Sequence, residues 1–589
     1  MAGSEQSTSP QSAKRSFGDR VRGGASLVLH HAKKHTGVGI VCAVAYFDPG
    51  NWGVDLQAGS QFGYHLLFIV LLAGLIAVFY QVLASRLGCV TGLDLASHSR
   101  LLLYNRPKHT LLYRWLGLYP LYMLAEIAIV ATDLAELLGS AIALCLLFPK
   151  LELWHGVLLT ATDVIFILAM GDPLRGKPVK MFELLIAALV LAVLISMVIV
   201  ISKVEVDWAQ AFDGFVPSKH IFASGGVYTS VGIIGATVMP HSLFLGSALA
   251  TQDRVSFRET HETELQKVES KDSTDELLEE KSEKPPSLIH KFFLDCKESI
   301  LAAFRTPSPS DYSKGVDTYA DHVNNAYEFV RAHIYHATFD MVGSLLGFAV
   351  IINSLILILA SAVFYYQNPN PGSTSPASLF DAYDLIRDSV GKPAATIFAI
   401  ALLCSGQSSS IIATVAGQAV CEGFIRWRVS PIMRRLVTRL LAIIPSVIVA
   451  IAVGRNGVDT LLIASQVVLS FVLPFITLPL LWCTSSKAIM TVKKTRLIDP
   501  PRISTTTTVE VEVVQISEKP LSSSCPAPSI VSSHGGEDTG AAELGEAQEE
   551  VVDYSNNKLT IGLGTVIWLV IAAANVYAIV ELGINPSNA

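Results

Sequence analysis

Long runs of apolar residues recur along this chain, and they limit the folds that it can adopt. A helix needs about 20 mostly apolar residues to cross the hydrocarbon core of a bilayer. Lipid offers no partner to backbone N–H and C=O groups, so such runs are expected to cross the membrane as α-helices. Eleven segments qualify as spans, at roughly 37–60, 65–87, 114–141, 154–171, 179–202, 226–250, 337–365, 393–416, 435–454, 459–482 and 558–582.

The composition agrees with an integral membrane protein. Hydrophobic residues make up 51% of the chain and charged residues only 16%, whereas soluble proteins carry about 25% charged residues. The net charge is -7, and the acidic residues gather in 255–285 and 536–553, outside the apolar segments. The sequence carries no basic footprint typical of nucleic-acid binding, so no nucleic-acid partner is expected. The eight cysteines form no CxxC pair, and neither a zinc site nor a disulfide framework is predicted.

The distribution of Lys and Arg predicts how the chain is oriented in the membrane. These residues gather on one side of the spans, which the positive-inside rule assigns to the cytoplasm. The N-terminus is then cytoplasmic and, after an odd number of spans, the C-terminus is not. The predicted parts are a disordered cytoplasmic tail at 1–35, spans 1–6 at 36–251, a disordered cytoplasmic insertion at 252–334, spans 7–10 at 335–484, a second such insertion at 485–556, and span 11 with a short non-cytoplasmic tail at 557–589.

Both insertions are polar and of biased composition, which favours disorder. Two interpretations stay open for them: they bind regulatory or trafficking partners, or they are solvated linkers without a fixed partner. The sequence also leaves open which membrane holds the protein, and the alternatives are the plasma membrane and a vacuolar or endosomal membrane.

The first predicted span is interrupted in its middle. The apolar run GVGIVCAVAYF meets Asp48-Pro49-Gly50-Asn51 and then resumes. Proline removes a backbone donor and glycine adds backbone freedom, so a regular helix is not expected to pass through. A carboxylate at this depth costs about 2.5 to 3.5 kcal/mol on insertion scales, which makes it a candidate functional group. The alternative is a plain proline kink in which the aspartate only caps a helix.

The sixth predicted span repeats this anomaly. Apolar residues flank Met239-Pro240-His241-Ser242 on both sides. Paired interruptions at corresponding positions of two halves indicate a substrate site near the membrane midplane in transporters built from inverted repeats. Spans 1–5 and 6–10 would be the two halves, because an odd number of spans in each repeat gives them opposite topologies.

The third predicted span carries three acidic residues inside an apolar stretch: Glu126, Asp133 and Glu136. The last two are three residues apart and therefore share one face of a helix. Such a face is not expected to point at lipid, and Arg439 in span 9 is the expected cationic counterpart. With His241 they form a series of titratable groups, which serves either as a proton relay or gate or as a structural network of buried ion pairs.

At these residues the chain resembles the natural-resistance-associated macrophage protein (Nramp) family of proton-coupled divalent metal transporters. The resemblance rests on Asp48-Pro49-Gly50-Asn51 with the following Asp55-Leu56-Gln57-Ala58-Gly59, on Gly235 to His241, on the span 3 motif around Glu126 to Glu136, and on Ser405-Gly406-Gln407-Ser408-Ser409 in span 8. It implies an all-α polytopic fold of eleven transmembrane helices: a leucine-transporter-like inverted repeat with spans 1 and 6 broken, plus one extra helix.

The resemblance also implies the site. The metal ligands would be the Asp48 carboxylate, the Asn51 amide oxygen, the backbone carbonyl of Ala236 and the Met239 thioether, with Gln466 of span 10 as a further candidate. A thioether is a soft donor, which favours transition-metal ions over Mg²⁺ and Ca²⁺. The groups assigned to proton relay or gating are His241, Glu126, Asp133, Glu136 and Arg439.

The expected function is proton-coupled import of divalent transition-metal ions, Mn²⁺ and Fe²⁺ with Co²⁺ and Cd²⁺ as further candidates, into the cytosol by alternating access. No enzyme activity and no permanently bound cofactor are expected; the partners are the metal ion, protons and the lipid bilayer. One rival keeps the fold but carries sodium and an amino acid, and the Met239 thioether argues against it. A second rival is a metal-sensing receptor that signals through the two insertions, which a flux measurement would separate from a transporter.

Overall fold

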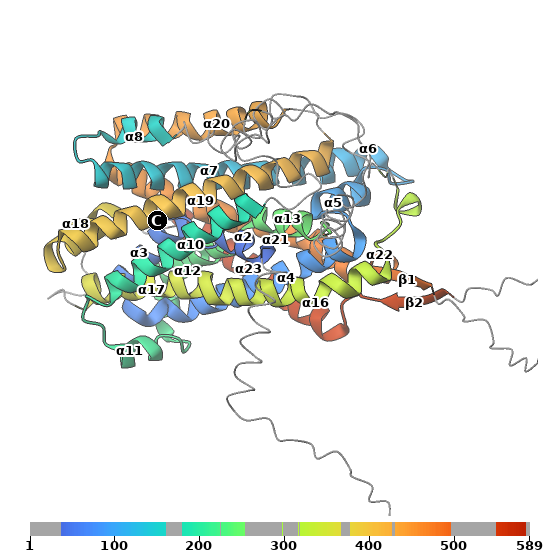
Figure 1. The fold of residues 1–589 in the computed structure, drawn as a ribbon, viewed down its shortest axis with the longest axis horizontal. Helices are drawn as coiled ribbons and strands as arrows, with labels where there is room; N and C mark the ends of the chain where they lie inside the picture. The colour runs from blue at the N-terminus through green and yellow to red at the C-terminus, as the bar shows by residue number, and fades with distance from the viewer. Residues whose placement is uncertain are drawn as a thin grey trace, which may run out of the picture. The chain divides into compact units, whose positions relative to one another are not determined.

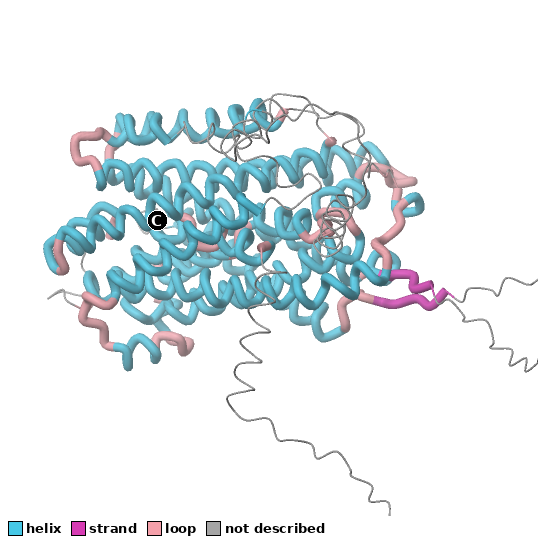
Figure 2. The backbone as a smooth tube through the Cα atoms, in the orientation of Figure 1, coloured by secondary structure: helices cyan, strands magenta, loops and turns pink. Residues whose placement is uncertain are grey.

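The computed structural model describes residues 37–160, 180–223, 225–253, 297, 316, 318–366, 377–426, 430–495 and 549–584. The chain divides into two compact units, Met1–Val492 with Asp553–Ala589 as the first and Lys493–Val552 as the second. Figure 2 shows that helix dominates the described residues, and that one pair of strands, β1 (Thr491–Thr495) and β2 (Glu549–Asp553), forms a two-stranded sheet.

The helices cover most of the first unit. In chain order they are α2 (Val38–Val44), α3 (Pro49–Phe62), η1 (Gly63–Leu66), α4 (Leu67–Thr91), α5 (Leu95–Leu103), α6 (Thr110–Tyr113), η2 (Arg114–Leu118), α7 (Tyr119–Leu147), α8 (Leu153–Thr160), α10 (Lys180–Ile201), α11 (Trp208–Asp213), η3 (Lys219–Phe222), α12 (Gly226–Thr237), α13 (Pro240–Leu249), η5 (Tyr319–Asp321), α16 (Tyr327–Ser344), η6 (Leu345–Val350), α17 (Ile351–Ala360), η7 (Ser361–Tyr365), α18 (Leu379–Ser389), α19 (Lys392–Ile425), α20 (Pro431–Ala452), α21 (Arg455–Ser485), α22 (Lys487–Met490) and α23 (Lys558–Ile584).

Eight helical stretches of the described residues are long and apolar enough to cross a membrane, and Leu436–Ala452 in α20 is a shorter apolar helix. One of the eight, Pro49–Thr91, runs through parts of the first two predicted spans. The predicted fourth span at 154–171 is described only as far as Thr160, and Asp163 lies outside the described residues. The helix that contains the predicted seventh span begins before residue 337, since α16 starts at Tyr327.

Two proline residues mark helix starts in the interior. Pro49 is the first residue of α3 and Pro240 the first of α13, a position where the missing N–H costs nothing. A residue before proline is restricted to extended conformations, and Asp48 and Met239 are both extended, with ψ angles of 169° and 122°. Helix α2 therefore ends at Val44 ahead of one proline, and α12 ends at Thr237 ahead of the other.

Long helices pack side by side around these starts. Helix α7 contacts α19, α20 and α21, and Figure 1 shows α7, α19 and α20 running alongside one another. Helix α3 packs on α17 and α12, while α21 contacts α12 and α23. The two short links of the interior, before Pro49 and before Pro240, are thus enclosed by other helices rather than by lipid.

The N-terminus of α2 is capped by a distant residue. Gly37 offers no side chain for the purpose, and the carboxylate of Asp340 in α16 accepts from the N–H groups of Gly39 at 2.7 Å and Gly37 at 3.4 Å. A negative charge at this end also opposes the positive end of the helix dipole. This geometry gives Asp340 a helix-end role.

Replacing this cap should destabilise the protein. Asp340→Ala leaves buried N–H groups of α2 without their acceptor and should lower the free energy of unfolding by about 1–2 kcal/mol. Asp340→Asn keeps an acceptor oxygen and should lose less. Thermal unfolding of the purified protein in detergent measures both, and equal melting temperatures for Asp340→Ala and wild type would contradict the capping role.

Candidate metal-binding site

The link between α2 and α3 exposes backbone carbonyls in the protein interior, and side chains from other helices bind them. The carbonyl of Phe47 accepts from Ser405 Oγ of α19 at 2.7 Å and from Trp52 Nε1 at 3.2 Å. The carbonyl of Tyr46 accepts from Asn353 Nδ2 of α17 at 2.8 Å. These bonds replace those that a continuous helix would make, and they fix the position of the next residue, Asp48.

Asp48 is fully buried and is the N-cap of α3. Its Oδ1 accepts from the backbone N–H and from the side-chain Nδ2 of Asn51, both at 2.8 Å. Among the described residues its Oδ2 has no hydrogen-bond partner. A buried carboxylate oxygen without a partner calls for a ligand, because most buried polar atoms in proteins have one.

The carbonyl of Ala236 is freed by Pro240. Ala236 lies four residues before Pro240, which has no N–H, so the regular helical partner of this carbonyl is missing. Asn51 Nδ2 donates to it at 2.9 Å. The amide nitrogen of Asn51 therefore lies between two oxygens, Asp48 Oδ1 and Ala236 O, where a cation would meet both of them.

The amide oxygen of Asn51 faces the other way. It accepts from Asn353 Nδ2 at 3.3 Å and from Thr237 Oγ1 at 3.4 Å. In this conformation the predicted amide-oxygen ligand is turned from Asp48 Oδ1, and a rotation of the amide about its Cβ–Cγ bond exchanges the two ends. The structure thus joins Asp48, Asn51 and Ala236 by direct contact.

The two remaining predicted ligands are also buried. Met239 is fully buried and lies in the two-residue link before Pro240, as the N-cap of α13. Gln466 of α21 is fully buried, and its amide packs so closely on Gly50 that a side chain at that position would require the amide to move. Its Nε2 donates to Ser465 Oγ at 3.1 Å, and among the described residues its Oε1 has no hydrogen-bond partner.

The predicted relay groups lie on α13, α7 and α20. His241 Nδ1 lies 3.2 Å from Thr132 Oγ1, and its Nε2 has no hydrogen-bond partner among the described residues. Asp133 follows Thr132 in α7 and forms a fully buried ion pair with Arg439, at 2.6 Å between Oδ1 and Nη1. Arg439 Nη2 also donates to Ser410 Oγ at 3.1 Å. The predicted pairing of Arg439 with span 3 is present.

The partner of Glu126 is an arginine that the sequence did not indicate. Arg434 Nη2 contacts both carboxylate oxygens of Glu126, at 3.0 and 3.1 Å. Arg434 is one of the Lys and Arg residues that the positive-inside rule assigns to the cytoplasmic side. One feature of the sequence could have predicted this pair. Glu126 and Asp133 are seven residues apart, or about two helical turns, so two separate cations on the facing helix would be needed to pair with both.

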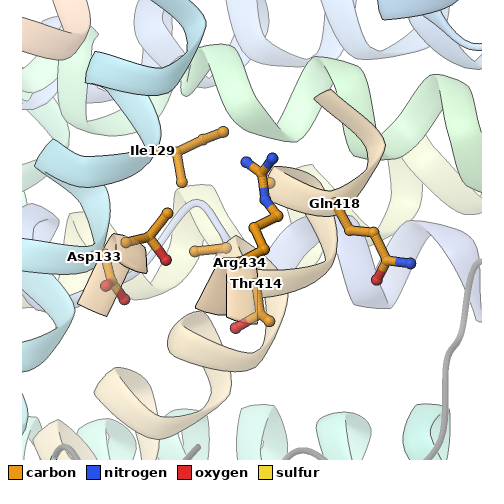
Figure 3. A pocket seen from close by; sticks show the side chains of 8 residues that line it. Ile129, Asp133, Thr414, Gln418 and Arg434 are labelled. Carbon is orange, nitrogen blue, oxygen red and sulfur yellow. The ribbon is translucent and has the colours of Figure 1, made fainter. Parts of the chain in front are cut away.

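A small cavity of about 10 Å³ lies between these two ion pairs, at the lower limit of the space for one water molecule. Figure 3 shows Asp133 and Arg434 lining it, with Thr414 and Gln418 from α19 opposite Ile129 of α7. Its lining residues are Ile129, Asp133, Ala413, Thr414, Gly417, Gln418, Arg434 and Thr438.

Two other carboxylates are buried, one on α7 and one on α3. Glu136 of α7 is buried as predicted. Asp55 of α3, one turn after Asn51, is buried too, and among the described residues its Oδ2 has no hydrogen-bond partner. Sequence analysis quoted Asp55 in a motif but gave it no role. In the described part of the chain no three His, Cys, Asp or Glu side chains converge as a metal cluster, so a metal here would depend on amide, thioether and backbone donors.

Comparisons with known proteins point to one family. The family described as natural resistance-associated macrophage protein-like matches residues 39–278 and 317–500. The manganese transporter pdt1 of Schizosaccharomyces pombe is 40% identical over 461 residues, which cover 78% of this chain and 76% of pdt1. The iron transporter SMF3 of Saccharomyces cerevisiae is 34% identical over 559 residues, which cover 94% of this chain and 97% of SMF3.

A solved structure extends the comparison to the fold. A manganese transporter of Eremococcus coleocola is 27% identical, with a TM-score of 0.61 over 94% of this chain and 88% of its own. The relatives are metal transporters rather than enzymes. Both halves of the helical unit match the family, and relatives at 34% identity or more match most of the chain. The protein therefore belongs to the Nramp family of metal transporters.

Proposed function

We propose that this protein is a proton-coupled secondary transporter that carries divalent transition-metal ions, chiefly Mn²⁺ or Fe²⁺, into the cytosol. The observation that carries the proposal is the meeting of Asp48, Asn51 and the Ala236 carbonyl at two proline-terminated links. The names of the relatives, manganese and iron transporters, support the choice of ions.

The ligand set would assemble with little movement. Rotation of the Asn51 amide would turn its oxygen toward Asp48 Oδ1 and Ala236 O, and a divalent cation would then bind where the amide nitrogen lay. Asp48 Oδ2 and Gln466 Oε1, both without hydrogen-bond partners among the described residues, supply further oxygens. The Met239 sulfur adds the soft donor that favours Mn²⁺ or Fe²⁺ over Ca²⁺.

Protons would be coupled to the metal through the same carboxylate. A metal ion binds ionised Asp48 and so competes with its proton. We assign the proton relay to His241, whose Nδ1 lies 3.2 Å from Thr132 Oγ1, and to the Asp133–Arg439 pair beside Thr132 on α7. Glu136 and the Glu126–Arg434 pair extend this series along α7.

We further propose the finer architecture: eleven spans, with spans 1–5 and 6–10 as inverted repeats, spans 1 and 6 broken at Pro49 and Pro240, and the N-terminus in the cytoplasm. Alternating access would arise from movement around the two links. An inward-negative potential of 100 mV contributes about 2.3 kcal/mol per charge moved inward, so uptake would need no ATP. A metal sensor with this fold would bind the ion without flux.

Asp48→Ala should abolish Mn²⁺ uptake, because it removes the only ionised ligand of the proposed set. Uptake of radioactive Mn²⁺ into proteoliposomes measures this at equal amounts of reconstituted protein. Asp213→Ala, at an exposed aspartate of α11, is the matched control and should transport as wild type does. Saturable uptake by Asp48→Ala would remove Asp48 from the ligand set.

Met239→Ala should weaken discrimination against Ca²⁺ while oxygen ligands still bind a divalent ion. A flux panel of Mn²⁺, Fe²⁺, Cd²⁺, Zn²⁺, Ca²⁺ and Mg²⁺ tests this. Met341→Ala, at another fully buried methionine in α16, controls for the cavity that the substitution creates. The thioether argument fails if both variants keep the selectivity of wild type.

Mn²⁺ entry should be accompanied by protons, and Asp133→Asn should reduce the protons carried per Mn²⁺. The substitution leaves the buried Arg439 cation without its carboxylate, which raises the electrostatic cost of a passing proton. A pH-sensitive dye inside the liposomes measures proton entry beside Mn²⁺ uptake. An unchanged ratio with normal Mn²⁺ uptake would assign the Asp133–Arg439 pair to the structural network instead.

A further inference from the structure

Helix α21 contains a backbone carbonyl that its own helix cannot satisfy. Pro474 lies inside α21 and has no N–H, so the carbonyl of Ser470, four residues earlier, lacks its regular partner. Ser470 is buried, and an unpaired carbonyl there would cost free energy comparable to a lost hydrogen bond. The partner must come from outside α21.

Asn575 of α23 supplies it. Its Nδ2 donates to the Ser470 carbonyl at 2.7 Å, and its Oδ1 accepts from Ser470 Oγ at 2.7 Å. Both ends of the buried amide are thereby used on one residue of α21. A second contact from the same helix lies one turn along, where Trp568 Nε1 donates to the Pro474 carbonyl at 2.8 Å. Helix α23 thus holds both carbonyls that flank the proline turn.

The stretch of α21 held in this way also carries Gln466. Gln466 lies one helical turn before Ser470, and Gly235 of α12 packs directly on the backbone of both residues. The side chain of Gln466 in turn packs on Gly50 of α3. At Gly235 and Gly50 the neighbouring atoms are already in close contact. A shift of the Ser470 turn would therefore move Gln466 and, through it, the two links of the site.

We propose that Asn575 is a positioning residue for the metal site, acting through Ser470 to fix the place of Gln466 against Gly50 and Gly235. The inference rests on the proposed function, because it takes Gln466 to face the transported ion. The rival explanation is a polar pair that only holds α23 to α21, as such pairs do in membrane proteins generally.

Asn575→Ala removes both hydrogen bonds to Ser470 and should raise the KM for Mn²⁺ about three- to tenfold, since part of their free energy fixes Gln466. The maximal rate should be nearly unchanged. Asn575→Leu keeps the side-chain volume while removing both hydrogen bonds, and it serves if the alanine variant does not fold. Val576→Ala, at the exposed neighbouring position of α23, should leave the KM unchanged.

Two double variants separate positioning from simple helix association. In a Gln466→Ala background, Asn575→Leu should have no further effect on the KM, because the group that it positions is gone. In a Pro474→Ala background, residue 474 regains an N–H for the Ser470 carbonyl, and the effect of Asn575→Leu should fall below about twofold. A merely structural pair would give the same KM in Asn575→Leu and wild type.

The outcomes are distinct for the two proposals. A wild-type protein that moves no Mn²⁺ in proteoliposomes would overturn the proposed function and this inference with it. An active wild type whose KM is unaffected by Asn575→Leu would overturn the inference alone. Effects of Asn575→Leu and Gln466→Ala on the KM that simply multiply would also overturn it, because they would show that Asn575 acts independently of Gln466.

Discussion

The interruptions of helical hydrogen bonding ahead of Pro49 and Pro240, in an apolar interior, are the constraint on which the rest of this structure depends. Pro49 and Pro240 each begin a helix where no water is available to bind the backbone groups left over. The surrounding helices are placed to supply the partners, so that Ser405, Asn353 and Asn51 reach the freed carbonyls of Phe47, Tyr46 and Ala236. The same carbonyl and amide oxygens are ligands suited to a cation, which supports the proposed metal site at these links.

The buried charges of this interior follow the same rule, that a buried polar group needs a partner. A lone charge inside a membrane is expensive, and the carboxylates of Asp133 and Glu126 on α7 each contact an arginine of α20. Asp48 differs, since neutral groups alone bind one of its oxygens and none of the described residues binds the other. A cation would therefore be accommodated more readily at Asp48 than at the paired carboxylates, which supports the proposal that the ion binds at the links.

Much of the site could be predicted because proline and buried charge act locally. The interruptions at Pro49 and Pro240 and the acidic face of α7 are visible in the sequence, and the pairing of Arg439 with that face is present in the structure. Arg434 and Asn575 were missed because their partners are distant in the sequence. Glu126 lies 308 residues from Arg434 and Ser470 lies 105 residues from Asn575, so only packing brings each pair together. The apolar sequence around Asn575 predicts a helix, but no residue near it in the sequence indicates that Ser470 is its partner.

The Ala236 and Ser470 carbonyls show how one chemical defect can serve two purposes. Each lies four residues before a proline, and each accepts from an asparagine of another helix, at 2.9 and 2.7 Å. Asn575 is fixed, because Ser470 Oγ occupies its other end in a bond of 2.7 Å. Asn51 is held at its other end by longer contacts of 3.3 and 3.4 Å, so it can exchange its nitrogen for its oxygen at lower cost. The longer contacts of the Asn51 oxygen suit the proposed rotation of its amide toward an ion, while the two short bonds of Asn575 suit a fixed position in the surrounding helices.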